Sequence, residues 1–220
     1  MISLETLYEN EEIIVINKPA GLAVQGGKGI THSVDTILPQ QQGYPIYLVH
    51  RLDKETAGIL VVAKNPKAAN LWTNILSSEN TIKEYNALCY GIPAKNTGTF
   101  SDVIVQKGTE KKAITHYTLL RQFKTSEGNF SLLSLKIDTG RMHQIRIHLA
   151  KNNLPILGDD KHGNFALNKM VKKNLGIKKL MLAAITLTIP IQKKKTTFSL
   201  EKPEHFIKAI EAIENIVHKE

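Results

Sequence analysis

The sequence predicts an α+β fold: a single domain over residues 1–220, with a mixed, mainly antiparallel central sheet flanked by helices and loops. Many apolar, β-branched runs of strand length occur, whereas few segments show the spacing of an amphipathic helix. Strands and helices do not alternate regularly, as they would in a parallel sheet. No repeat, low-complexity tract or obvious linker divides the chain, and 220 residues are enough to bury a sound core.

The expected elements follow in chain order. The run IIVI at residues 13–16 indicates a buried strand that ends at the turn-forming KPAG. Further strands are expected at 47–49, 59–63, 85–90, 113–120, 130–137 and 180–189. Apolar residues three or four positions apart predict helices over 67–78 and 203–217. Trp72 lies on the apolar stripe of the first helix, so we interpret it as a core residue rather than a platform for base stacking.

Composition and charge favour a polyanionic partner. The formal net charge is +9 and the isoelectric point is about 9.5. An anionic membrane would also attract this charge, but no basic amphipathic helix and no apolar run of membrane-spanning length occurs. The N-terminus lacks the basic start and apolar core of a secretion signal. The one cysteine, Cys89, excludes an internal disulfide framework, and we expect a cytoplasmic protein.

Two lysine-rich stretches and one glycine-rich loop are candidates for phosphate binding. The lysines cluster at residues 161–179 and 193–195. Each single lysine is most simply a solvated surface residue, and the second cluster a hairpin turn, but together they are able to contact RNA phosphates. The loop at 21–29 approaches a P-loop pattern, yet Gly29 stands where serine or threonine is required. We therefore exclude nucleotide binding there.

A short polar turn, HRLDKETAG at residues 50–58, separates two of the expected strands. It places Asp53 beside Arg51 on a loop held at both ends, which is how functional groups are often presented. An isolated aspartate in a turn is more often a solvated cap or half of a surface ion pair. The wider context of the turn therefore decides its interpretation.

That context resembles the RluA-type family of pseudouridine synthases, whose signature is His-Arg-Leu-Asp followed by Thr-Ser-Gly. Three further blocks occur in the family's order: EEIIVINKPAGLAVQGG (11–27), KEYNALCYG (83–91), and LKIDTGRMHQIRIHLA (135–150) followed by PILGDDKHG (155–163). The resemblance covers about residues 8 to 190 and implies the family's catalytic fold. It also implies an isomerase that converts uridine to pseudouridine in rRNA or tRNA without a cofactor.

The resemblance implies a role for each matching residue. Asp53 corresponds to the family's essential aspartate, which acts as nucleophile or base, and Arg146 to the arginine that pairs with it and keeps it charged. Tyr85 matches the tyrosine that stacks against the target uracil. Arg51 resembles the arginine that enters the RNA stack when the target uridine flips out, although it is equally able to pair with Glu55.

Three more residues follow Gly140 at an expected strand-to-helix turn. Arg141, His143 and Gln144 are candidates for phosphate contacts near a helix N-terminus. Metal binding is not expected, because His143 and His148 are five residues apart and cannot converge on one ion from a helix or a strand. No HExxH or paired-cysteine spacing occurs either.

The chain departs from the family pattern in three places. Ala57 replaces the usual serine, and Ala184 stands where many relatives carry histidine. As a third departure, we expect the protein to lack the N-terminal RNA-binding appendage of many relatives. We therefore expect substrate choice to rest on the catalytic core, its lysine-rich surface and insertions such as residues 29–44.

Two rival functions remain. One is a non-catalytic RNA-binding or ribosome-assembly protein on the same scaffold, which need not keep Asp53, Tyr85 and Arg146 together. The other is a glycosidase-like hydrolase, whose usual pair of carboxylates is not found here. The sequence does not distinguish rRNA from tRNA as the substrate, and a monomer is the simplest expectation.

Overall fold

The structure, a computed structural model, describes residues 3–106 and 108–217. The ends of the predicted domain, residues 1–2 and 218–220, lie outside the described residues. The chain divides into two compact units, each made of two separate segments. Unit 1 contains residues 1–82 and 184–201, and unit 2 contains residues 83–183 and 202–220. Both units combine strands with helices, which confirms the α+β class. One catalytic domain over residues 1–220 stays a prediction.

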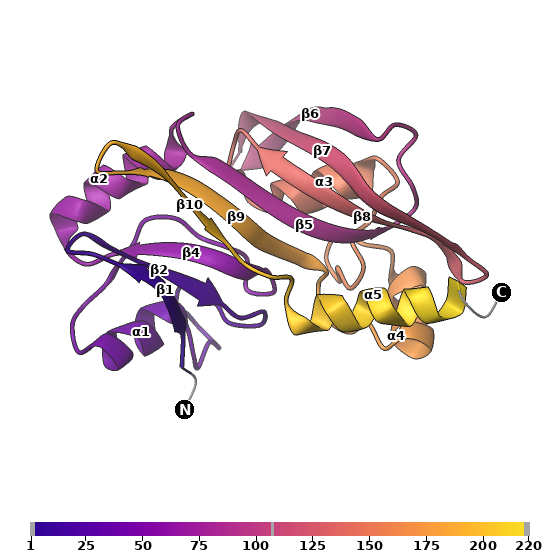
Figure 1. Cartoon of the computed structure of the whole chain (residues 1–220), viewed down its shortest axis with the longest axis horizontal. Helices are drawn as coiled ribbons and strands as arrows, with labels where there is room; N and C mark the ends of the chain where they lie inside the picture. The colour runs from indigo at the N-terminus through magenta and orange to yellow at the C-terminus, as the bar shows by residue number, and fades with distance from the viewer. Residues whose placement is uncertain (1–2, 107, 218–220) are drawn as a thin grey trace. The chain divides into compact units, whose positions relative to one another are not determined.

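Unit 1 is built on a sheet in the order β1-β2-β4-β9, with β3 paired to β4 and β10 to β9 (Figure 1). Its strands are β1 (Glu5–Glu9), β2 (Ile13–Lys18), β3 (Tyr47–Leu48), β4 (Ala57–Ala63), β9 (Leu182–Ile191) and β10 (Lys194–Ser199). β1, β3 and β10 run antiparallel to their partners, as does β2 to β4. All seven residues of β4 are buried, which explains its uninterrupted apolar sequence.

Two helices belong to unit 1. α2 (Pro66–Ser77) confirms the predicted helix; Asn65 caps it by accepting a hydrogen bond from the Ala68 amide at 2.8 Å. Trp72 is buried in the core cluster formed with β2, β4 and β9, and its Nε1 donates to Glu12 Oε2 at 2.9 Å, so its interpretation as a core residue is confirmed. α1 (Val34–Gln42) was not predicted, because a proline lies inside it and few of its residues are apolar.

Unit 2 contains a second antiparallel set of strands in the order β5-β8-β7-β6. They are β5 (Ile82–Tyr90), β6 (Thr97–Gln106), β7 (Thr109–Thr125) and β8 (Gly128–Ile137). The unit also contains α3 (Gln144–Lys151), α4 (Phe165–Leu175) and α5 (Glu204–Val217). α3 packs against β6 and β7, α5 packs against β7, and α4 contacts α5 (Figure 1). The strands predicted at β5, β7 and β8 and the C-terminal helix are confirmed; β6 and α4 were not predicted.

The second lysine cluster, residues 193–195, lies at a hairpin turn, which confirms the simpler of its two interpretations. Gln192 and Lys193 connect β9 to β10 with positive φ angles of 48° and 65°, the conformation of a tight hairpin. Among the described helices, none is both long enough and apolar enough to span a membrane.

Candidate active site

Asp53 lies in unit 1 on the loop between β3 and β4, and its neighbours fix its orientation. Arg51 is exposed, Leu52 is buried, and Asp53, which follows them, is half-buried. The Thr56 amide donates to the Asp53 carbonyl at 3.1 Å, closing a turn directly before β4. The buried Leu52 side chain anchors the loop in the core, so the loop holds Asp53 at the edge of the core with its side chain half-exposed.

A buried lysine, Lys18 at the end of β2, ties this loop to the sheet. Its Nζ donates to three carbonyl oxygens: Leu22 at 2.7 Å, Pro19 at 3.0 Å and Lys54 at 3.1 Å. Burial lowers the pKa of Lys18 to about 8, although the negative charges of Glu55 and Asp53 act in the opposite direction. Lys18 is therefore mostly charged at pH 7 and supplies a positive charge that acts on Asp53. From the sequence alone, Lys18 was recognisable only as part of the turn KPAG.

His50 and Gly58 fix the two ends of the loop. His50 Nε2 accepts a hydrogen bond from the Val61 amide at 2.9 Å, so this nitrogen carries no proton. Gly58 has a φ of +116°, and a Cβ at this position would lie 2.0 Å from the Ala184 carbonyl oxygen on β9. The last glycine of HRLDKETAG is thus required by the close approach of β9 to β4.

In unit 2, Arg146 on α3 forms a buried, bidentate ion pair with Asp159. Arg146 Nε donates to Asp159 Oδ2 at 2.9 Å and Arg146 Nη2 to Oδ1 at 2.7 Å. The backbone amides of Lys161 and His162 also donate to Asp159 Oδ1, both at 3.0 Å. Burial alone would raise the pKa of the Asp159 carboxyl, but these hydrogen bonds outweigh it and hold the pKa below its usual value.

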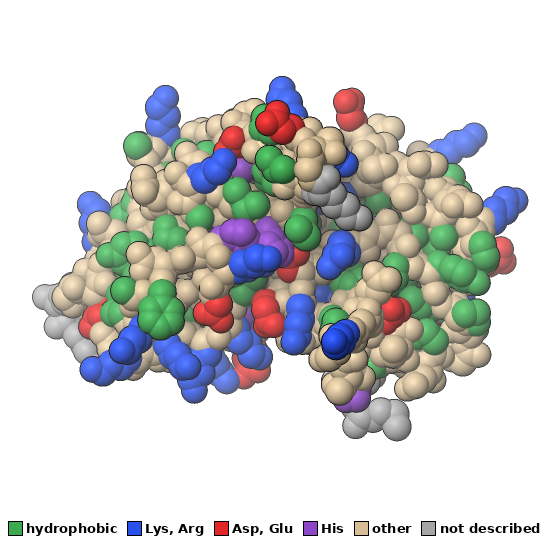
Figure 2. Space-filling model, turned by 180° about the vertical axis from the view of Figure 1, so that it is seen from behind, with side chains coloured by type: hydrophobic (Ala, Val, Ile, Leu, Met, Phe, Trp, Pro, Cys, Tyr) green, Lys and Arg blue, Asp and Glu red, His purple; other side chains and the backbone are tan. Residues whose placement is uncertain are grey.

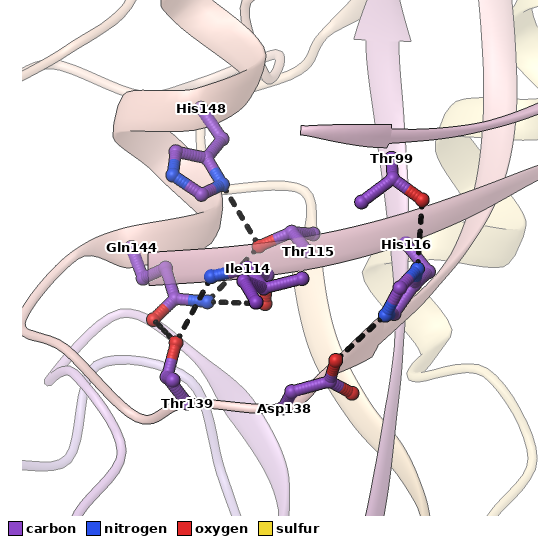
Figure 3. A network of polar contacts seen from close by, with 8 residues as sticks. All are labelled: Thr99, Ile114, Thr115, His116, Asp138, Thr139, Gln144 and His148. Carbon is purple, nitrogen blue, oxygen red and sulfur yellow. Dashed lines mark hydrogen bonds and ion pairs between the residues drawn. The ribbon is translucent and has the colours of Figure 1, made fainter. Parts of the chain in front are cut away.

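Gln144 is buried and fully engaged within unit 2 (Figure 3). Its Oε1 accepts from Thr139 Oγ1 at 2.7 Å and from the Arg141 amide at 3.1 Å. Its Nε2 donates to the Ile114 carbonyl at 2.8 Å and to Thr115 Oγ1 at 3.1 Å. Each polar atom of the amide therefore has two partners in the protein. This arrangement favours a role in holding α3 against β7 over the expected phosphate contact.

His148 joins the same network one turn further along α3. Its Nδ1 lies 3.0 Å from Thr115 Oγ1, and burial lowers the pKa of the imidazole (Figure 3). His143 contacts a different partner, with its Nδ1 2.8 Å from His162 Nε2. The two histidines of the motif therefore bind separate groups. Within the described residues, no cluster of three or more His, Cys, Asp and Glu side chains is arranged to hold a metal ion.

The remaining candidates lie on three elements. Tyr85 is buried on β5, where its alternate neighbours Ala87 and Cys89 are fully buried. Arg141 is half-buried and its Nε donates to the Lys112 carbonyl at 3.3 Å. In the glycine-rich loop, the carboxylate of Asp35 takes the place that a phosphate would need, since the Gly26 amide donates to both of its oxygens at 3.0 Å. That contact agrees with the exclusion of a phosphate cradle.

The structure therefore groups the predicted residues in two places. Asp53 and Arg51 share one loop of unit 1, and Arg141, His143, Gln144 and Arg146 gather at the start of α3 in unit 2. The expected pairing of Arg146 with Asp53 would join the two units and stays a prediction. Sequence reasoning missed Lys18 and Asp159. For Lys18 the available signal was a charged residue directly after an apolar strand, whereas Asp159 stands in the polar stretch GDDKH and carries no such signal.

Known proteins share both the sequence and the fold. A family model described as RNA pseudouridylate synthase matches residues 12–151. A protein of Rickettsia prowazekii named ribosomal large subunit pseudouridine synthase C is 42% identical over 172 residues, which cover 72% of this chain and 56% of that protein. Ribosomal large subunit pseudouridine synthase D of Haemophilus influenzae is 31% identical over 96% of this chain and 71% of its own length. The chain thus spans little more than half of its Rickettsia relative.

Solved structures agree on the fold. The human protein titled RNA Pseudouridylate Synthase Domain Containing 4 superimposes with a TM-score of 0.76 over 96% of this chain and 93% of its own, at 24% identity. Human RNA Pseudouridylate Synthase Domain Containing 1 gives 0.75 over 91% and 84% at 23% identity. The resemblance seen in the four motif blocks is confirmed: the chain belongs to the RNA pseudouridylate synthase family.

Proposed function

We propose that this protein is an RNA pseudouridine synthase that isomerises uridines in ribosomal RNA, with Asp53 as its nucleophile or base. The observation that carries the proposal is the anchored loop, which presents the half-buried carboxylate of Asp53 directly before Lys54, whose carbonyl accepts a hydrogen bond from the buried Lys18. The relatives named for the large ribosomal subunit favour rRNA over tRNA. The cytoplasmic location, the monomeric state and the lack of a cofactor stay predictions.

The reaction asks for few groups. The N1–C1′ bond of uridine breaks, the C5–C1′ bond forms, and the C5 proton leaves for solvent while N1 regains one. A carboxylate is suited to begin this exchange because it is ionised at neutral pH and is both nucleophilic and basic. The turn that holds Asp53 between β3 and β4 reduces the entropy lost on orienting the carboxylate.

The other matching residues take supporting roles in this proposal. Tyr85 stacks on the target uracil, and Arg51, exposed beside Asp53, fills the gap that the flipped uridine leaves. Asp159 orients Arg146 through their bidentate pair, and Gln144 orients the helix that carries it. Arg141 and His143 are the remaining candidates for RNA contacts at the start of α3.

The test replaces one carboxylate by its isosteric amide. Transcribed large-subunit rRNA labelled with tritium at uridine C5 is incubated with wild-type protein, with Asp53→Asn and with Glu55→Gln. Glu55 is the matched control, because it is an exposed acid in the same loop. We expect tritium release from the wild type and Glu55→Gln, and none from Asp53→Asn, while all three proteins bind the RNA.

Pseudouridine maps of cellular RNA identify the substrate. Sites that vanish from rRNA when the gene is deleted, and return with wild type but not with Asp53→Asn, support the proposal. Sites that vanish from tRNA instead would correct the substrate. RNA binding by a wild-type protein that releases no tritium from any rRNA or tRNA would favour the non-catalytic alternative.

A further inference from the structure

An aromatic side chain stands out from the surface of unit 2. Phe165, the first residue of α4, is 86% exposed, and no other large hydrophobic residue in the described part of the chain is as exposed. Single exposed apolar residues are common on protein surfaces. The chemistry around Phe165 therefore decides whether its exposure has a use.

The segment around Phe165 is strongly basic. Residues 161–179 contain six lysines and no aspartate or glutamate, and every one of these lysines is exposed. They are Lys161, Lys169, Lys172, Lys173, Lys178 and Lys179. In the region of α4, Figure 2 shows a protruding hydrophobic group with blue Lys and Arg side chains below it and red Asp or Glu side chains beside it. The surface thus combines an aromatic ring with a cluster of exposed lysines, while the acidic side chains of Glu127 and Glu204 act on the segment from other elements.

Helix geometry aligns the ring with two of the lysines. Lys169 and Lys172 follow Phe165 by four and seven residues, so the three side chains share one face, about 6 and 10 Å apart along the axis. Val171 and Leu175 are buried about 100° around the helix from this face, whose own three residues are all exposed. We call Phe165, Lys169 and Lys172 the α4 face.

The α4 face is rigidly joined to the loop that orients Arg146. Asn164 caps the helix by accepting from the Leu167 amide at 3.0 Å. Asn168 donates to the Asp159 carbonyl at 2.9 Å and accepts from the Gly158 amide at 3.1 Å. A ligand held by the α4 face would therefore have a fixed position relative to Asp159 and the start of α3.

We propose that the α4 face is an RNA-docking surface, on which Phe165 stacks against an unpaired base and Lys169 and Lys172 contact the adjoining phosphates. The inference rests on the proposed function. Stacking uses the flat face of any base, and lysines neutralise phosphates, so one aromatic ring in line with cations fits single-stranded RNA. A membrane is disfavoured because the apolar side of α4 is used inside the protein, leaving one phenylalanine to insert.

The test separates stacking from charge. Binding of fluorescein-labelled oligouridine and of a fully paired RNA hairpin is measured by anisotropy for wild type, Phe165→Ala and Phe165→Trp. We expect Phe165→Ala to weaken oligouridine binding about 5- to 150-fold and to leave hairpin binding within twofold. Phe165→Trp should bind oligouridine at least as tightly as wild type. Leu71→Ala, which removes an exposed apolar side chain from α2, is the matched control and should change neither.

The lysines are tested through the dependence of binding on salt. The double variant Lys169→Gln, Lys172→Gln should weaken binding of both RNAs. The slope of log K against log salt concentration should become less negative by about 1.4 to 1.8, because two phosphate contacts are lost. Lys67→Gln on α2, outside both lysine clusters, is the control for removing an exposed lysine elsewhere. Equal oligouridine binding by Phe165→Ala and wild type overturns the proposal. So does a loss of binding by Phe165→Ala to phosphatidylserine vesicles without a loss to RNA.

This outcome is distinguishable from failure of the proposed function. A wild type that isomerises rRNA while Phe165→Ala binds oligouridine normally removes only the docking surface. A wild type that isomerises no RNA, although Phe165→Ala binds oligouridine more weakly, removes only the synthase.

Discussion

The close approach of β9 to β4 makes one glycine of the Asp53 motif irreplaceable. In Gly58→Ala the new Cβ would lie 2.0 Å from the Ala184 carbonyl oxygen and 2.7 and 2.8 Å from its carbonyl carbon and amide nitrogen. These are backbone atoms of a strand, so relief requires β9 to move away from β4. Overpacking costs about 1 to 3 kcal/mol and the positive φ about 1 to 2 kcal/mol more. We expect a loss of about 2 to 5 kcal/mol in the free energy of unfolding.

Gly43→Ala separates steric overlap from backbone strain. Gly43 ends α1 with a φ of +80°, and nothing lies within 4 Å of a Cβ built there. This variant should lose only about 1 kcal/mol. In thermal unfolding followed by circular dichroism, we expect Tm to fall by about 4 to 20 °C in Gly58→Ala and by about 2 to 4 °C in Gly43→Ala. Equal shifts in the two variants would refute the argument that β9 excludes a side chain at Gly58.

Two further predictions concern the buried charges that sequence reasoning missed. Because the pKa of Lys18 is lowered to about 8 from 10.5, the unfolded state binds more protons between these pH values. The free energy of unfolding should therefore rise by up to about 3 kcal/mol between pH 8 and pH 10.5 because of this residue. Urea titrations at both pH values should show this rise in the wild type and not in Lys18→Met. An equal rise in the two proteins would contradict the prediction. Asp159→Asn should cost about 3 to 5 kcal/mol by breaking the buried bidentate ion pair with Arg146, whereas Asp160→Asn at the exposed neighbouring acid should stay within about 0.5 kcal/mol. A similar small loss in both variants, measured by chemical denaturation, would show that the ion pair is dispensable.

Elements whose burial is continuous were predictable from the sequence. β2 and β4 are buried on both faces, so their residues are almost all apolar, and α2 carries a regular stripe. α4 buries only Val171 and Leu175 among many lysines, and β6 buries little beyond Ile104. With so few buried positions, neither the helical spacing of α4 nor the strand alternation of β6 can be recognised in the surrounding polar sequence. Their structure depends on partners distant in the sequence.

The site divides in the same way. Asp53 was predictable because its turn, its flanking strands and the family motif all fall within one short stretch. Lys18 and Asp159 were not, since their roles depend on carbonyls and a guanidinium that the fold brings to them. Gln144 was expected to face RNA, but burial turned it toward Thr139 and Ile114. The residue type indicated that the Gln144 side chain forms hydrogen bonds, but not whether its partners lie in the protein or in the RNA.

The interleaving of the two units has a consequence for biosynthesis. Unit 1 includes residues 184–201, so its sheet lacks β9 and β10 until the whole of segment 83–183 has left the ribosome. Until then the hydrophobic edge of β4 has no neighbouring β9, and such unpaired edges promote aggregation. Pairing strands so distant in the sequence is also slow. Nascent chains stalled before residue 184 should therefore depend on chaperones more than the finished protein does.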